Sequence, residues 1–165
     1  MNISITPSTF TYTLKVDGGK GVDLLAKFDS VFPLQIIQGE DVYMTAVLSN
    51  ECKDDAGPFQ YGYWFSTANQ LDANDKLMVA KDVAGLLGKK TLSVDDKAII
   101  PVEAKPGPAY VLVSADVSNT VAESQELNNA AAAAVEVVKL CLADVFEPNG
   151  APQIASPLLP GKTPD

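Results

Sequence analysis

The sequence contains no histidine and no arginine, and each absence excludes a class of function. Without histidine there is no histidine-based catalytic triad, few ways to build a zinc site, and no side chain that ordinarily titrates near neutral pH. Without arginine, and with a net charge of −9, the chain lacks the basic surface that nucleic-acid phosphates require. These absences predict a protein that is not an enzyme and does not bind nucleic acid.

Long apolar runs are also missing, so we expect no membrane insertion. Residues 1–20 lack a basic segment followed by an apolar stretch, which argues against a signal peptide. An intracellular chain and a segment of a secreted precursor both remain open on these grounds. The acidity disfavours anionic membrane surfaces but suits calcium wherever carboxylates cluster. With 165 residues, 47% of them apolar, the chain has room for one folded domain with short extensions.

From Val22 onward, short apolar segments alternate with turn residues, and no amphipathic helix is evident. The expected strands cover residues 22–28, 41–50, 59–67, 76–82, 90–101, 108–116 and 129–138. Seven short strands at this spacing predict an all-β fold, a seven-stranded immunoglobulin- or fibronectin III-like β-sandwich with Greek-key connections.

Period-two patterns indicate which faces of two strands are buried. The predicted core positions are Val42, Met44, Ala46 and Leu48 in one strand, and Phe59, Tyr61, Tyr63 and Phe65 in the next. Trp64 falls on the opposite face, where packing under a loop is favoured over a surface contact. The alanines at 130–134 alone would suit a helix, but residues 135–138 favour a strand, which we predict.

The chain divides into three parts by composition. Residues 1–21 form an extended leader or linker, which is either an extra edge strand or the end of a preceding domain. Residues 22–139 form the sandwich. Residues 140–165 are rich in proline and mark a linker or the edge of another domain.

Residues 22–138 resemble the CARDB family, a bacterial and archaeal cell-adhesion-related module with an immunoglobulin-like fold. The most specific stretch, ADVSNTVAESQELNN over residues 115–129, is similar to the family pattern A-D-x-x-N-x-V-x-E-S-x-E-x-N-N. Further support comes from residues 22–24, 38–42, 56–59, 65–67 and 71–75. The resemblance implies an adhesion or spacer role in a secreted or cell-surface protein, with no catalytic residues.

The proline-rich tail is similar to the opening of a second family, the bacterial pre-peptidase C-terminal domain. The matching residues are Asp144-Val145-Phe146-Glu147-Pro148-Asn149, followed by Ala155-Ser156-Pro157-Leu158 and Gly161. Both families occur in modular secreted proteins. The tail therefore implies an alternative role, as an accessory domain of a secreted peptidase.

Two acidic loops are candidate calcium sites, since carboxylate and amide oxygens suit hard cations. The first loop carries Asp116, Asn119, Glu123, Glu126, Asn128 and Asn129. The favoured interpretation is a loop whose Asp and Asn side chains hydrogen-bond to its own backbone. A calcium site is the second interpretation, and a pair of carboxylates for general acid–base catalysis is the third. The second loop carries Asp72, Asn74 and Asp75, where a polar turn is favoured over calcium because an EF-hand's glycine and distal glutamate are missing.

Topology suggests a third arrangement for calcium. In a fibronectin-like sandwich the Asp72–Asp75 loop lies at the end where the last strand exits. That would place it beside Asp144 and Glu147, and a calcium ion there would stiffen the junction to the next domain.

The same topology separates the two cysteines. Cys52 follows the second expected strand and Cys141 the last one, at opposite ends of strands that span roughly 33 Å, whereas bridged Cα atoms lie within about 7 Å. We therefore predict no intrachain disulfide. Residues 95–97 are interpreted as a solvated turn or edge feature.

Three functions remain. The leading hypothesis is a non-catalytic extracellular adhesion or spacer module that contacts other protein domains or a cell-surface ligand. The second is a filament or surface-layer subunit that self-associates by donating its N-terminal strand to a neighbour. The third is the peptidase accessory domain implied by the tail.

Overall fold

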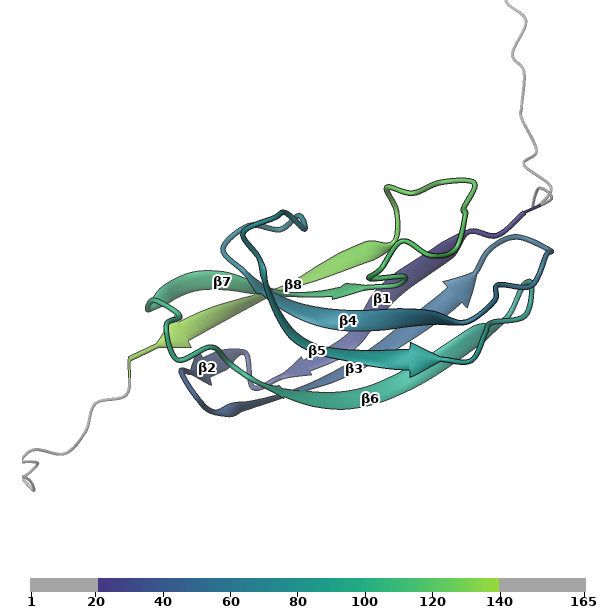
Figure 1. Ribbon diagram of the computed structural model, residues 1–165. Coiled ribbons are helices and arrows are strands. Elements are labelled where there is room, and N and C mark those ends of the chain that lie inside the picture. Colours follow the sequence, from purple (N-terminus) through teal and green to yellow (C-terminus); the bar gives the residue numbers. More distant parts are fainter. Residues whose placement is uncertain (1–20, 140–165) are drawn as a thin grey trace, which may run out of the picture.

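The computed structural model describes residues 21–139, which form two packed β-sheets (Figure 1). The strands are β1 (Leu24–Phe32), β2 (Gln35–Ile37), β3 (Asp41–Asn50), β4 (Phe59–Ser66), β5 (Lys76–Val83), β6 (Thr91–Ile99), β7 (Gly107–Ser114) and β8 (Ala130–Val138). One sheet has the order β1-β3-β6 and the other has the order β2-β8-β7-β4-β5. The predicted all-β sandwich is confirmed, and no helix in this part of the chain is long and apolar enough to cross a membrane.

The short strand β2 is the element that the sequence prediction missed. It pairs in parallel with β8, Gln35 opposite Glu136 and Ile37 opposite Val138, and so adds an edge to the five-stranded sheet. Three residues contain too few alternations to reveal a period of two. The connection from β1 to β2 therefore carries the chain from one sheet to the other over two residues, Pro33 and Leu34.

The core lies between the sheets and is filled by the predicted alternating faces. In β3, Val42, Met44, Ala46 and Leu48 are all buried. In β4 the buried set is Phe59, Tyr61, Tyr63 and Phe65, again as predicted. Full burial of one large aliphatic side chain contributes about 1.5–3 kcal/mol, so these two stripes account for much of the stabilisation.

The alanines of β8 form a strand because β7 requires a partner along its whole length. Ser114, Leu112 and Tyr110 of β7 stand opposite alanines 130, 132 and 134 in an antiparallel ladder. The backbone hydrogen bonds and the packing of the neighbouring residues 135–138 outweigh alanine's preference for a helix. The choice of strand over helix is thus confirmed.

Strand directions place the two ends of the described chain at opposite ends of the sandwich (Figure 1). Val22 forms a bridge with Glu123, in the loop that precedes β8. From that loop β8 runs away along the sheet for nine residues. At about 3.3 Å per residue, the chain enters and leaves roughly 30 Å apart.

Candidate functional site

The loop between β7 and β8 contains the ADVSNTVAESQELNN motif, and its first half is closed by Asp116. This residue has a left-handed backbone, with φ at 45°. Its Oδ1 accepts hydrogen bonds from the Thr120 amide and hydroxyl, each at 3.0 Å, and its Oδ2 accepts one from the Val121 amide at 2.7 Å. Both carboxylate oxygens are therefore used to hold the loop's own backbone, as in the turn favoured from sequence.

The second half of the motif holds the chain that enters β1. The Glu123 carboxylate accepts hydrogen bonds from the Leu24 amide and, at 2.7 Å, from Asn129 Nδ2. The Ser124 amide donates to the Val22 carbonyl at 2.8 Å, and Asn128 Nδ2 donates to Asp23 Oδ1 at 3.0 Å. We call this set of contacts between residues 123–129 and residues 22–24 the strand clamp.

Burial raises the pKa of Glu123 and is the main influence on that carboxyl group. The hydrogen bonds from Leu24 and Asn129 act in the opposite direction, since they favour the charged form. The nearby charges of Glu126 and Asp116 raise the pKa further. Glu123 is therefore a half-buried structural acid whose charged form is held by an amide and a carboxamide.

Asp72, Asn74 and Asp75 form a polar turn in which aspartate side chains accept hydrogen bonds from the turn's own backbone amides. Asp72 Oδ1 accepts from the Asn74 amide at 2.6 Å, and Asp75 Oδ2 accepts from the Asp72 amide at 2.7 Å. The loop leaves β4 toward the end where β8 exits, but residues 69–71 fold back over the first residues of β8. Asp144 and Glu147 lie outside the described residues, so the junctional calcium site stays a prediction.

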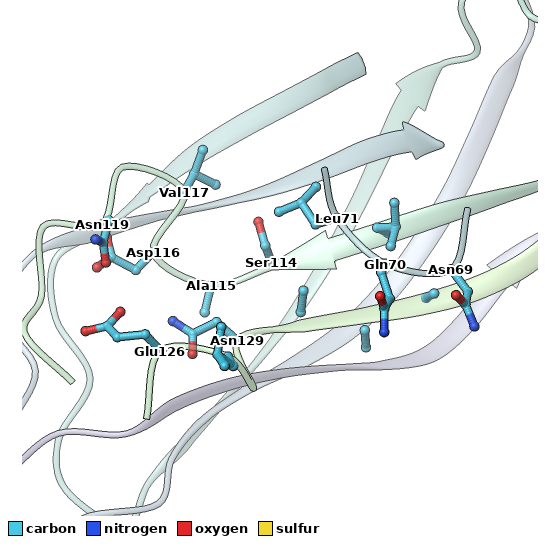
Figure 2. A pocket seen from close by; sticks show the side chains of 15 residues that line it. Asn69, Gln70, Leu71, Ser114, Ala115, Asp116, Val117, Asn119, Glu126 and Asn129 are labelled. Carbon is cyan, nitrogen blue, oxygen red and sulfur yellow. The ribbon is translucent and has the colours of Figure 1, made fainter. Parts of the chain in front are cut away.

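The predicted metal ligands are only partly brought together. Asp116, Asn119 and Glu126 gather at one end of a groove (Figure 2), whereas the Asp72–Asp75 turn belongs to a separate loop. Within residues 21–139, no three carboxylate or thiolate side chains are close enough together to hold a metal ion. Calcium binding by these loops remains a proposal.

The groove runs over the outer face of the five-stranded sheet and has a volume of about 790 Å³. Its floor is made of small side chains from β7 and β8, including Ser114, Ala130 and Ala132. Figure 2 shows Asn69 and Gln70 at the end opposite Asp116 and Glu126. Sequence reasoning missed the contribution of Asn69 and Gln70, because only the folding back of the β4–β5 loop brings them to this face.

A second polar cluster lies between the two sheets, and it corrects the prediction for Asp96, whereas Asp95 and Lys97 are exposed on the edge strand β6 as expected. The Asp96 side chain is fully buried, and its Oδ2 accepts a hydrogen bond from the Tyr61 hydroxyl at 2.7 Å. Its Oδ1 pairs with the ammonium of Lys81, which reaches in from β5. Burial, with the adjacent Asp96 charge, raises the pKa of Tyr61 above its usual range. The cluster links β6 to β4 and β5 across the sandwich.

The alternation of β6 contains the signal that would have placed Asp96 correctly. Val94, Asp96 and Ala98 share a face, and Ala98 is buried. A carboxylate on such a stripe needs a buried cation or donor, which Lys81 and Tyr61 provide.

Cys52 is a buried free thiol near the point where the chain enters. Its Sγ lies 3.7 Å from Ser124 Oγ, next to the strand clamp. Cys141 lies outside the described residues, so the predicted absence of a disulfide between the two cysteines stays a prediction. Val138, the last residue of β8, is at the opposite end of the sandwich (Figure 1).

Comparison with known families identifies one match over most of the chain. The profile of the CARDB family matches residues 22–133, which include the strand clamp and the whole β7–β8 loop. The tail lies outside the matched residues, so its resemblance to the pre-peptidase C-terminal family stays a prediction. No curated protein matches the sequence significantly.

Solved structures share the fold at low sequence identity. The crystal structure of a CARDB domain from Pyrococcus furiosus, in complex with di-metal ions, is 18% identical and has a TM-score of 0.56, covering 79% of this chain and 100% of that one. A solution structure of a domain from Methanosarcina acetivorans, whose name assigns its protein to the cell surface, is 20% identical with a TM-score of 0.50, covering 72% and 94%. At these identities the similarity concerns the fold.

Proposed function

The chain belongs to the CARDB family, and on that premise we propose that it is a non-catalytic spacer module of a secreted or cell-surface protein. Two observations carry the proposal. The points where the chain enters and leaves the sandwich are separated by the length of β8, and the strand clamp holds the incoming segment. A segment held at Val22 and Leu24 by hydrogen bonds has a fixed direction relative to the sandwich. A domain of this design holds its neighbours apart at a defined distance.

The way in which the β7–β8 loop uses its carboxylates supports a non-catalytic role. In the β7–β8 loop, Asp116 and Glu123 each accept hydrogen bonds from backbone amides or a carboxamide through both oxygens. Carboxylates used in this way are poorly placed for proton transfer to a substrate. A cell-surface location is supported by the family and by the fold shared with the Methanosarcina domain.

The spacer proposal is tested by measuring the distance between the points where the chain enters and leaves the sandwich. Spin labels at positions 21 and 139 of the full chain, with both native cysteines replaced by serine, should give one narrow distribution near 30–40 Å, label linkers included. The Glu123→Ala variant removes the two carboxylate hydrogen bonds of the strand clamp and should broaden the distribution while the circular dichroism of the sheets is retained. A broad distribution in the parent protein would contradict the proposal.

A second candidate function, binding of a ligand, is favoured by the groove of about 790 Å³. Its walls present carboxamides and two carboxylates over a floor of small side chains, which leaves the space open. A cell-surface ligand or another protein domain would fit the role expected from sequence. Screening of the chain against glycans and cell-surface extracts, with Asn69→Ala and Glu126→Ala as variants that alter the groove, tests this function.

Calcium stabilisation is a further proposal, motivated by the acidic loops and consistent with the Pyrococcus domain's complex with di-metal ions. Thermal unfolding in excess calcium and in excess chelator should then differ, because an ion that binds the folded state raises the melting temperature. Single replacements of Asp72, Asp75, Glu123 and Glu126 would locate the site. Identical melting curves in calcium and in chelator would contradict calcium stabilisation.

Two alternative functions from the sequence analysis also remain proposals. A filament or surface-layer subunit that donates residues 1–20 to a neighbour would form concentration-dependent oligomers, and a strictly monomeric profile at high concentration would argue against it. The accessory role beside a peptidase depends on the tail's resemblance alone.

A further inference from the structure

Large apolar side chains are exposed on the outer face of the three-stranded sheet and in the loop that follows β6, around the Asp41–Lys97 ion pair. Phe32, Tyr43, Ile99 and Val102 are 69%, 52%, 61% and 74% exposed, respectively. Clusters of exposed apolar groups rimmed by polar residues mark interaction sites in soluble proteins. We call these four residues the exit patch, because they lie at the end of the sandwich where the chain leaves β8.

The strand register places the members of the exit patch beside one another. Phe32 of β1 stands directly opposite Tyr43 of β3. Tyr43 is opposite Lys97 of β6, and Ile99 is opposite Asp41. Lys97 Nζ donates to Asp41 Oδ2 at 2.8 Å, so Ile99 is the diagonal neighbour of Tyr43 across this ion pair on the same face. Val102 follows β6 and contacts the turn at Gly39, where a Cβ would lie 3.5 Å from Val102 Cγ1.

The same end of the sandwich is where the chain leaves β8 (Figure 1). Phe32 is followed within two residues by Leu34, whose carbonyl accepts a hydrogen bond from the Glu136 amide at 2.8 Å. Ile37 stands opposite Val138, and the Gln38–Glu40 turn against which Val102 lies comes next. Residue 139 therefore leaves the five-stranded sheet beside the end of β2, at the end of the sandwich that carries the exit patch.

The segment that follows has the composition to cover an apolar surface. Residues 140–146 read LCLADVF and contain four large apolar side chains: Leu140, Leu142, Val145 and Phe146. Seven extended residues reach up to roughly 23 Å, which is enough to cross a three-stranded sheet whose strands are about 4.8 Å apart.

We propose that residues 140–146 dock on the exit patch, so that the segment leaving the sandwich is fixed against the outer face of β1, β3 and β6. This surface goes beyond the spacer function and does not depend on it. Apolar burial supplies the affinity, and the covalent connection at residue 139 makes docking an intramolecular event with a high effective concentration.

Photocrosslinking in the full-length chain tests the proposal directly. With p-benzoylphenylalanine in place of Ile99, illumination should join the tryptic peptide 98–139 to the tryptic peptide 140–162 within one chain; the first peptide stays intact at Lys105 because Pro106 follows it. The same probe in place of Leu127, which is 99% exposed at the opposite end, is the matched control and should not reach the peptide 140–162. Crosslinks only between two chains would indicate a second copy as the occupant and would overturn the proposal, as would no crosslink or equal crosslinking from position 127.

Hydrogen exchange provides a second readout. In the parent chain the amides of residues 140–146 should exchange at least about tenfold more slowly than in an unstructured peptide of the same sequence. The double variant Tyr43→Ser, Ile99→Ser should abolish this protection while the amides of β3 and β6 stay protected. The Leu87→Ser variant, which changes an exposed leucine outside the patch, should leave it unchanged. Unprotected exchange of residues 140–146 in the parent chain would overturn the proposal.

Discussion

At the scale of single residues, the polar side chains that matter most are those that bond to the protein itself. Asp116 closes its own loop, Glu123 holds the first strand, and Asp96 joins the two sheets. In each case a carboxylate meets backbone amides, a phenol or an ammonium. A buried or half-buried charge is tolerated only with such partners, so the primary role of these residues is structural.

The hydrogen bond from Tyr61 to Asp96 gives a prediction with a built-in control. The Tyr61→Phe variant removes one donor from a fully buried carboxylate and should lower the free energy of unfolding by about 1–3 kcal/mol. The Tyr43→Phe variant makes the same chemical change on an exposed face and should alter it by less than about 0.5 kcal/mol. Urea denaturation of both variants measures the difference, and equal effects would show that the buried bond contributes nothing specific.

Glu123 gives a prediction about pH. Because burial raises its pKa above the ordinary value of 4.5, the folded state holds the proton more tightly than the unfolded chain does. The stabilising contribution of this group is therefore fully present below the unfolded pKa and is lost as the pH rises through the folded pKa. The free energy of unfolding of the parent, minus that of Glu123→Gln, should decrease as the pH is raised from about 4 to about 7. Urea titrations across that range check the sign, and a difference that grows with pH would contradict it.

At the scale of elements, β4 shows how one strand serves both faces of its sheet. Its inner side chains, Tyr61 and Tyr63, pack edge to face with ring centroids 5.9 Å apart. On the outer side, Trp64 Nε1 donates a hydrogen bond to Ser114 Oγ at 2.9 Å. Between them, Gly62 leaves space that Val117 and Leu77 fill from neighbouring segments. The outward orientation of Trp64 agrees with the sequence prediction.

Replacement of Gly62 by alanine tests this close packing. The added Cβ would lie 2.9 Å from Val117 Cγ2 and 3.1 Å from the Val79 carbonyl oxygen, so the β7–β8 loop or the β5 ladder must shift. We expect a loss of about 1–3 kcal/mol in unfolding free energy. The Gly57→Ala variant, whose Cβ would meet nothing within 4 Å, should be near neutral. Equal stability of the two variants would show that the contact is not restrictive.

At the scale of the whole molecule, the sheets are joined on both sides. Lys81 and Asp96 connect β5 to β6 along one edge. On the other side, the chain passes from β1 into β2 and joins β8. The strand clamp fixes one end, and the exit patch is proposed to bind the segment that leaves the other. The described residues should consequently unfold as one cooperative unit.

Cooperative unfolding is tested with two independent probes. The fluorescence of Trp64, the single tryptophan, reports on the outer face of the five-stranded sheet, and far-ultraviolet circular dichroism reports on all strands. The two urea transitions should coincide within error. Separate midpoints would show that one sheet or the β7–β8 loop unfolds independently.

The sequence alone determined the all-β class, most strand positions and the inner faces of β3 and β4. Alternation with period two is a local property, so Val42 to Leu48 and Phe59 to Phe65 reveal their buried sides without a partner. The motif at residues 115–129 likewise identified the family and marked the loop. What the motif's carboxylates bind was beyond the sequence, since Leu24 is 99 residues from Glu123.

Only the tertiary structure decided which polar groups meet. The parallel strand β2 exists because β8 offers it an edge, and Asp96 is buried because Tyr61 and Lys81 approach from the other sheet. The groove forms where the β4–β5 loop folds back over the β8 alanines, and the exit patch forms where three strands align Phe32, Tyr43 and Ile99. Each depends on contacts between distant segments. A local pattern such as the alternation of β6 can indicate a buried face, but it does not name the partner groups, because these meet only after the chain has folded.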